Sequence, residues 1–175
     1  EDDWYFFDPR EAELHDCFGK DFDDKYNSLV DLAENGHIDN WRKIPAKELW
    51  KKMLKVLFET SHPWNTFKDP CNIRYTNQHE GIVHSSNLCT EITLHTKASE
   101  YKEGEKTKTG EPAVCNLGSV NLVNHINEKG DDLDHDKLAN TIHLAVRMLD
   151  NVIDLNFYPT KEASNSNSKN RPIGL

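Results

Sequence analysis

Positive charge is scarce in this sequence. Its 175 residues hold 21 lysines and arginines against 30 aspartates and glutamates, which gives a formal net charge of −9 with histidine neutral. Binding to a nucleic-acid backbone requires a basic surface, so nucleic acid is not an expected partner. Long apolar runs are lacking too: none approaches the ~20 residues that a membrane span requires, and no signal peptide is visible. We therefore expect a cytoplasmic protein without a membrane partner.

Cysteine is also infrequent, with four residues in the whole chain: Cys17, Cys71, Cys89 and Cys115. This number is too small for a disulfide-stapled secreted scaffold of this length. No pair has C-x-x-C spacing and the nine histidines are scattered, so no metal site is predicted and zinc binding is the weakest hypothesis. Reactive or buried thiols in a cytosolic protein fit better.

The stretch Ser85–Ile92, with the sequence SSNLCTEI, carries an amide, a thiol and a carboxyl group at every second position. These groups belong to Asn87, Cys89 and Glu91. Alternate side chains of an extended backbone point the same way, so they would line one wall and face one small ligand. In a helix, at about 100° per residue, Cys89 would face away from the other two. The intervening side chains would point into packing: Leu88, Thr90 and Ile92.

Apolar spacing predicts two helical regions in the first part of the chain. Residues 4–9 read as an extended segment that enters a turn. A helical pattern then covers residues 10–35, divided near Gly19. A second helix covers residues 45–62, because proline is tolerated in its first turn and His-Pro ends it. Residues 64–84 are polar and broken by proline and glycine, which suggests loops with short strands.

The second part of the chain mixes strand and helix patterns. Residues 92–96 alternate as a strand, and the charged residues 97–112 read as an exposed hairpin or loop. Residues 113–120 read as a buried strand that turns helical toward residue 127. Residues 134–155 form the clearest amphipathic helix, with Asp134 as its N-cap. Residues 160–171 are polar, and we expect them to be exposed.

Alone, the triplet around Cys89 is weak evidence of a site, because a cysteine in apolar surroundings is usually a small buried hydrophobe. Further segments change that balance. They are WYFFDP at 4–9, DPCN at 69–72, AVCNLGSVNL at 113–122 and NRPIGL at 170–175. In order and wording, these segments and SNLCTEI resemble the large, catalytic subunit of ribonucleotide reductase, most closely the aerobic class I ribonucleoside-diphosphate reductases. The resemblance covers essentially the whole chain.

The resemblance implies an α/β fold that is part of the family's ten-stranded α/β barrel, with the active-site cysteine on a loop inserted into the barrel. The family's catalytic subunits are several times longer than this chain. The sequence begins with Glu1 in place of methionine and stops inside a glycine-rich motif. We therefore expect residues 1–175 to be an internal fragment of the catalytic barrel domain, without an internal domain boundary.

The resemblance also assigns catalytic roles. Cys89 matches the cysteine that becomes a transient thiyl radical and takes the 3′-hydrogen of the substrate. Glu91 matches the general base that takes the 3′-hydroxyl proton, a role that a carboxylate shielded from water suits. Asn87 matches the amide that orients the substrate and Glu91. The substrate-binding residues implied are Ser86, Asn87, Leu88, Cys89 and Glu91.

Cys115 matches one of the two thiols that supply the reducing equivalents and end as a redox-active disulfide. By the family pattern, its partner cysteine lies upstream of residue 1. Cys71 lies in a segment that the family shares, and we expect a structural role for it. Cys17 lies on a predicted helix and is expected to be a packed or idle thiol.

The full enzyme implied is an allosteric, nucleotide-binding oxidoreductase of deoxyribonucleotide biosynthesis, which supports DNA replication. Its partners would be a ribonucleoside diphosphate, a small subunit that contains a metal and generates the radical, thioredoxin or glutaredoxin as reductant, and a second copy in a homodimer. Its effectors would be ATP and deoxynucleotides. No cofactor is expected on this fragment. Without the family's diphosphate-binding loop, allosteric sites and C-terminal relay, the isolated chain should be inactive.

Two alternatives stay open at this point. The cobalamin-dependent reductases share a similar N-x-C-x-E pattern, although the wording NLCTEI with CNLGS and NRPIG favours class I. A non-catalytic binding module would keep the fold without the radical chemistry. The presence of Asn87, Cys89, Glu91 and Cys115 together argues against such a module, since a scaffold needs none of them.

Overall fold

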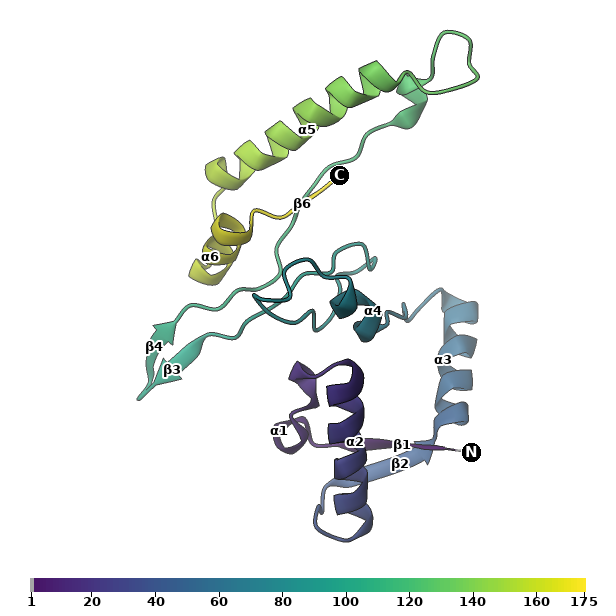
Figure 1. The fold of residues 1–175 in the computed structure, drawn as a ribbon, viewed down its shortest axis with the longest axis vertical. Helices are drawn as coiled ribbons and strands as arrows, with labels where there is room; N and C mark the ends of the chain where they lie inside the picture. The colour runs from purple at the N-terminus through teal and green to yellow at the C-terminus, as the bar shows by residue number, and fades with distance from the viewer. Residues whose placement is uncertain (1) are drawn as a thin grey trace. The chain divides into compact units, whose positions relative to one another are not determined.

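The computed structural model describes residues 2–175 and divides the chain into two units, the first ending at Leu94 and the second running from His95 to Leu175 (Figure 1). Two compact units can both be parts of one barrel domain. The expectation of a single domain without an internal boundary therefore stays a prediction. Helices and strands are mixed throughout the described residues, as expected for an α/β protein.

The first unit opens with an antiparallel pair of strands, β1 (Asp3–Phe7) and β2 (Trp41–Pro45). Aromatic side chains of β1 pack on Tyr26 of helix α2 (Gly19–Glu34), with ring centroids 5.3 Å apart for Trp4 and 5.8 Å apart for Phe7. Such aromatic pairs contribute beyond the apolar area that they bury. The predicted extended segment at 4–9 is thus confirmed over β1.

Short helical turns connect β1 to α2. Helix α1 (Pro9–Ala12) and the 3₁₀ helix η1 (Leu14–Asp16) precede Gly19, which starts α2, so the predicted division at that glycine is confirmed. The predicted second helix is also confirmed, as α3 (Ala46–Thr60).

Helix α4 (Lys68–Ile73) is a correction to the sequence prediction. Residues 64–84 were expected to form loops with short strands, but in the structure they hold this helix and no strand. Pro70 was taken as a breaker, yet it lies in the first turn of α4, where a missing backbone N–H costs nothing.

The second unit holds a hairpin, a small parallel pair and two helices. Strands β3 (Glu100–Lys102) and β4 (Glu105–Lys108) form the predicted hairpin. Strand β5 (Asn116–Leu117) pairs in parallel with β6 (Ile173–Gly174) at the end of the chain. The predicted strand at 113–120 is therefore wrong in length, since β5 covers two of its residues. The predicted strand at 92–96 is also wrong, because those residues form no regular strand.

Two helices of the second unit, η2 (Leu122–His125) and α5 (His135–Leu155), follow the predictions closely. The 3₁₀ helix η2 is the predicted helical turn after β5. Helix α5 is capped by Asp134, whose carboxylate accepts a hydrogen bond from the Lys137 amide at 3.0 Å. No helix within residues 2–175 combines the length and the apolar character that a membrane crossing requires.

Helix α6 (Lys161–Asn170) corrects the expectation that residues 160–171 would be exposed. Ser166 and Asn167 are buried, and Ser166 Oγ donates a hydrogen bond to the Pro112 carbonyl at 2.6 Å. Asn116 Nδ2 donates to Asn167 Oδ1 at 3.0 Å. Ser166 and Asn167 can be buried because each has a hydrogen-bond partner, which offsets the free-energy cost of removing their polar groups from water.

A buried carboxylate organises the start of the second unit. Glu111 is 5% exposed, and its side chain accepts hydrogen bonds from His95 Nε2 at 3.0 Å, Lys169 Nζ at 2.9 Å and Asn170 Nδ2 at 3.2 Å. Lys97 Nζ lies 3.7 Å from the same carboxylate. Burial by itself would raise the pKa of Glu111, but these hydrogen bonds and the Lys97 charge outweigh it and lower the pKa to about 2.

Candidate functional site

Residues 86–92 form a short closed loop, which we call the Cys89 loop. Ser86 Oγ donates a hydrogen bond to the Ile92 carbonyl at 2.5 Å, and the Ile92 amide donates to Asn87 Oδ1 at 3.2 Å. Inside the loop, the Thr90 amide donates to the Asn87 carbonyl at 3.4 Å, which closes a tight turn. The two ends of the loop are therefore tied together by side chains of its own first residues.

Thr90 has a left-handed backbone, with a φ of +64°. A β-branched residue rarely adopts this conformation, because its side chain crowds the backbone. Strain of this kind costs on the order of 1–3 kcal/mol, and it is found most often at active sites and ligand clamps. The strained residue directly follows Cys89.

The turn corrects the geometry that alternation predicted. The backbone is not extended at residues 88–90, so Asn87, Cys89 and Glu91 do not line one wall as successive strand positions. All three are exposed. Leu88 was expected to pack, but it is 89% exposed at the tip of the loop. Glu91 was expected to be shielded from water, and in the described residues it is not.

The same turn agrees with what the family resemblance implied, a cysteine on a loop. Residues Thr90 and Ile92 are half-buried, as the alternation predicted for them. The loop thus presents its thiol and carboxylate outward and keeps two of its intervening side chains against the unit.

Asn72 fixes the segment that leads into the Cys89 loop. Its side chain is 2% exposed; its Oδ1 accepts from the Val83 amide at 2.8 Å, and its Nδ2 donates to the Val83 carbonyl at 2.9 Å. A side-chain amide here does the work of a neighbouring strand, since it satisfies both backbone groups of one residue. Nδ2 also donates to the Lys68 carbonyl at 3.0 Å, a bond within α4, so the two bonds to Val83 are what join this segment to the helix.

A pocket of about 290 Å³ lies beside the Cys89 loop, in the first unit. Ser86, Asn87 and Thr90 of the loop contribute to its wall, whereas Leu88, Cys89 and Glu91 do not. The rest of the wall is mostly polar: Trp64, Thr66, Lys68, Cys71, Val83, His84, Ser85 and Thr93. Hydroxyl groups and one lysine suit a hydrogen-bonding ligand with negative charge.

Two side chains in the pocket wall, Lys68 and His84, are titratable. Burial lowers the pKa of Lys68, although the nearby Asp16 charge opposes this shift. Its Nζ donates a hydrogen bond to the His15 carbonyl. His84 lies in the same wall, with its Nε2 2.7 Å from Asp16 Oδ1. The hydrogen bond from His84 lowers the pKa of Asp16.

The four cysteines form no disulfide with one another in the described chain. Cys115 is half-buried and directly precedes β5, in the second unit. Cys71 is half-buried on α4 and lines the pocket beside the Cys89 loop, and its expected structural role stays a prediction. Cys17 follows η1, and its Sγ lies 3.8 Å from the Glu13 carbonyl.

Sequence reasoning missed Asn72, Lys68 and His84 as parts of this site. Asn72 belongs to the DPCN segment, which was noted as shared with the family but was given no role. Lys68 and His84 carry no spacing signal, because they face the pocket through the packing of α4 against the segment before the loop. Only the three-dimensional structure brings them beside Asn87.

Comparisons with known proteins agree with the motifs. The family model for the ribonucleotide reductase barrel domain matches residues 1–175. The chain is 51% identical over 173 residues to the ribonucleoside-diphosphate reductase subunit alpha of Chlamydia trachomatis, covering 98% of this chain and 15% of that protein. It is 34% identical over 174 residues to the large subunit of Danio rerio, covering 99% of this chain and 20% of that protein.

A third relative, the large chain of Schizosaccharomyces pombe, is 35% identical over 175 residues, which is 98% of this chain and 19% of that protein. The chain thus spans 15% to 20% of the length of these three relatives. The resemblance drawn from the motifs, and with it the α/β barrel-domain assignment, is confirmed.

Proposed function

The chain belongs to the ribonucleotide reductase barrel-domain family, and from that premise we propose that it carries the thiyl-radical site of a ribonucleoside-diphosphate reductase. The proposal concerns the larger protein, because the chain spans only a part of its relatives' length. The relatives are named ribonucleoside-diphosphate reductases and are alpha or large subunits, which favours this reading over a reductase of the cobalamin-dependent class. The observation that carries the proposal is the Cys89 loop, which presents a thiol and a carboxylate together.

In this proposal, Cys89 exchanges hydrogen with the ribose. As a thiyl radical it takes the 3′-hydrogen, and a thiol suits this because its S–H bond is weak enough for the exchange to be reversible. Glu91 takes the 3′-hydroxyl proton, which requires a positioned carboxylate within hydrogen-bond reach. The 2′-hydroxyl then leaves as water, and Cys89 returns the hydrogen to C3′.

Cys115 supplies reducing equivalents in the same proposal. Removal of the 2′-hydroxyl consumes two electrons and two protons, which two thiols provide when they form a disulfide. Cys115 would be one of them, with a partner cysteine outside this chain. Thioredoxin or glutaredoxin would then reduce the disulfide for the next turnover.

Asn87 and Ser86 have a double role in the proposal. Both belong to the pocket wall, where they can hydrogen-bond a substrate, and both close the Cys89 loop through Ile92. Preorganisation of this kind lowers the cost of holding reacting groups in place. Leu88 lies away from the pocket, so contact between Leu88 and substrate would require a surface that other parts of the protein supply.

The remaining parts of the proposal follow from the family alone. They are a small subunit that supplies the radical, ATP and deoxynucleotide effectors, a homodimer, and a cytoplasmic role in making DNA precursors. No residue of this chain is assigned to the radical source. A radical delivered from elsewhere would reach the substrate through Cys89.

Replacement of Cys89 tests the proposal. We expect Cys89→Ser in the intact protein to abolish deoxynucleotide formation without lowering the melting temperature, because an O–H bond is too strong for the exchange and the side chain is exposed. Cys17→Ser is the matched control, since it changes a thiol in another element, and it should keep turnover. Deoxynucleotide formation by Cys89→Ser above background would overturn the role assigned to Cys89, whereas a parent protein that forms none would favour a non-catalytic binding module.

A further inference from the structure

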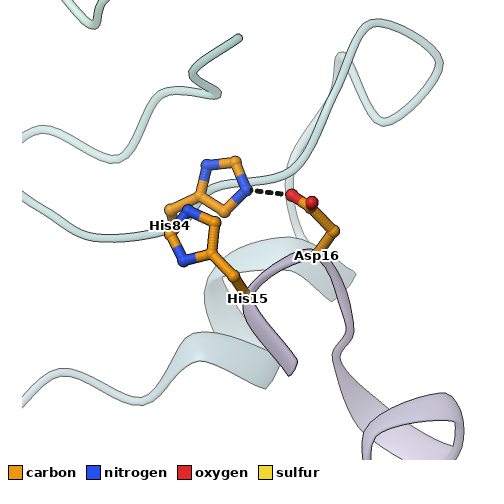
Figure 2. Close-up of side chains that lie close together, drawn as sticks. All are labelled: His15, Asp16 and His84. Carbon is orange, nitrogen blue, oxygen red and sulfur yellow. Dashed lines mark hydrogen bonds and ion pairs between the residues drawn. The ribbon is translucent and has the colours of Figure 1, made fainter. Parts of the chain in front are cut away.

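Three side chains with metal-ligating atoms come together in the first unit, although 68 residues separate the second of them from the third. His15 and Asp16 belong to η1, and His84 lies in the segment before the Cys89 loop. Their ligand atoms all lie within 4.8 Å of one another. Figure 2 shows the His84 ring stacked on the His15 ring and its nitrogen aimed at the Asp16 carboxylate. The ring centroids are 4.0 Å apart, with 2° between the ring planes.

We propose that His15, Asp16 and His84 form a binding site for a divalent transition-metal ion of the zinc class. Two imidazoles and one carboxylate are ligands that Zn²⁺ prefers, and three protein ligands leave a fourth position for water. Neutral imidazole also suits Co²⁺ and Ni²⁺, while a purely oxygen-ligating ion such as Mg²⁺ would find one carboxylate here. The proposal does not depend on reductase activity.

The distances require a small rearrangement. Ligand atoms around a tetrahedral zinc with bonds of about 2.0–2.1 Å are about 3.3 Å apart. His84 Nε2 and Asp16 Oδ1 are 2.7 Å apart because they share a hydrogen bond, so a metal that replaces this proton would move them apart by about half an ångström. The third ligand, His15, has to leave its stacked position, because the lone pair of an imidazole lies in the ring plane.

Exposure decides which ligands can move. The His84 side chain is 11% exposed and is held in place, whereas the Asp16 side chain is 77% exposed and His15 is exposed too. Exposed side chains change rotamer at small cost. The site therefore has one fixed ligand and two that can turn toward an ion.

Some of the surrounding charges favour a bound cation and one opposes it. The Asp16 carboxylate brings negative charge to the site, and the His84 side chain lies beside it at 2.7 Å. Lys68 opposes a cation, since its Nζ is bonded to the His15 carbonyl and its charge interacts with Asp16. Asp69 also interacts with Lys68 and offsets part of that charge. We therefore expect an affinity near the micromolar range, below that of a buried structural zinc site.

Equilibrium dialysis of the intact protein against about 10 µM zinc, which fills a micromolar site, tests the proposal. Bound zinc is measured for the parent and for His84→Ala, His15→Ala and Asp16→Asn. Each variant should bind one equivalent less than the parent. Cysteines elsewhere contribute equally in all of them, so the difference isolates this site.

His79→Ala is the matched control, because its imidazole is 73% exposed in the same unit but lies outside the cluster. It should bind as much zinc as the parent. His15→Ala and Asp16→Asn change exposed side chains, so a loss of binding in them does not reflect unfolding. Parent-like binding by all variants overturns the proposal, and so does a loss in His84→Ala alone or an equal loss in His79→Ala.

Discussion

Two glutamates show how differently this chain uses the same side chain. Glu91 is exposed in the Cys89 loop, while Glu111 is 5% exposed and accepts hydrogen bonds from three side chains. Glu91 is the one that the sequence motif singled out, and Glu111 was read as part of a solvated, charged loop. A carboxylate that serves chemistry must stay available to a ligand, whereas one that serves the fold is saturated by the protein itself.

The difference between these two glutamates indicates which substitutions should change stability and which should change activity. Glu111 ties the residues before the hairpin to α6, because Lys169 and Asn170 of that helix and His95 before the hairpin all reach its carboxylate. Glu91 ties nothing together in the described residues. A change at Glu111 should therefore act on folding and a change at Glu91 on turnover.

The largest effect is expected for Glu91→Gln. Glutamine keeps the shape and hydrogen-bonding reach but cannot accept a proton, and loss of a positioned base costs a factor of about 10²–10⁴ in rate. The melting temperature should stay near that of the parent, since an exposed substitution changes stability by about ±0.5 kcal/mol. Steady-state turnover of the intact protein is the measurement. Turnover within a few-fold of the parent would remove Glu91 from the proposed mechanism.

Acidification should reveal the opposite behaviour of Glu111. Its pKa falls from 4.5 to about 2 on folding, so its contribution is complete above pH 4.5 and is lost as the pH falls toward 2. The loss is on the order of 3 kcal/mol. Melting temperatures measured from pH 6 downward check this. The series starts about one and a half pH units above the ordinary pKa of glutamate, where Glu111 is ionised in the folded and the unfolded protein. The same pH series on Glu111→Gln gives the contribution of the other carboxylates. An equally steep loss of stability in that variant would refute the assignment of the loss to Glu111.

A somewhat smaller effect is expected for Glu111→Gln at neutral pH. Hydrogen bonds to charged groups contribute about 1.5–3 kcal/mol, and we expect a loss of stability in that range. The cost stays below that of breaking a fully buried ion pair, because Lys97 and Lys169 are 27% and 40% exposed and can turn to water. Denaturant unfolding measures it, with the exposed Glu105→Gln as control. Equal stability of the two variants would contradict a structural role for Glu111.

The smallest effect is expected for Asn72→Ala. Two neutral hydrogen bonds to Val83 are lost, which costs about 1–2 kcal/mol because water in the adjacent pocket can replace them. Unlike Glu111→Gln, this variant should also lower turnover, by roughly tenfold, because the Cys89 loop loses its upstream anchor. Asn77→Ala, an exposed position just beyond α4, is the control. Unchanged turnover in Asn72→Ala would show that the anchor is dispensable.

Helices were predictable from the sequence where a strong signal was present. Apolar spacing and a capping residue located α3 and α5, and both are confirmed. Strands were less predictable, because β5 and β6 have two residues each and their pairing joins residues 116 and 173. Helix α6 escaped prediction since its buried face is made of serine and asparagine, whose burial depends on partners that no local pattern reveals.

For the candidate site, the motif proposed the residues, but the predicted backbone geometry was wrong. The motif located Asn87, Cys89 and Glu91, but alternation implied a straight backbone. The structure has a turn there, since the side chains of Ser86 and Asn87 bond the backbone of Ile92 more closely than a strand would allow. Hydrogen bonds from side chains to the backbone can replace those between strands. They leave no periodic pattern of apolar residues in the sequence, so hydrophobic patterning cannot detect them.

The Asn72 anchor sets a fixed length of chain ahead of the Cys89 loop. Val83 is held at one end and Ser86 at the other, so residues 84 and 85 are the whole tether between them. An extended residue adds about 3.3–3.6 Å, while a reacting group has to be placed within about 0.5 Å. One inserted or deleted residue in this tether would therefore misplace Cys89 by several times that tolerance. In related sequences, the number of residues between Val83 and Ser86 should therefore stay constant.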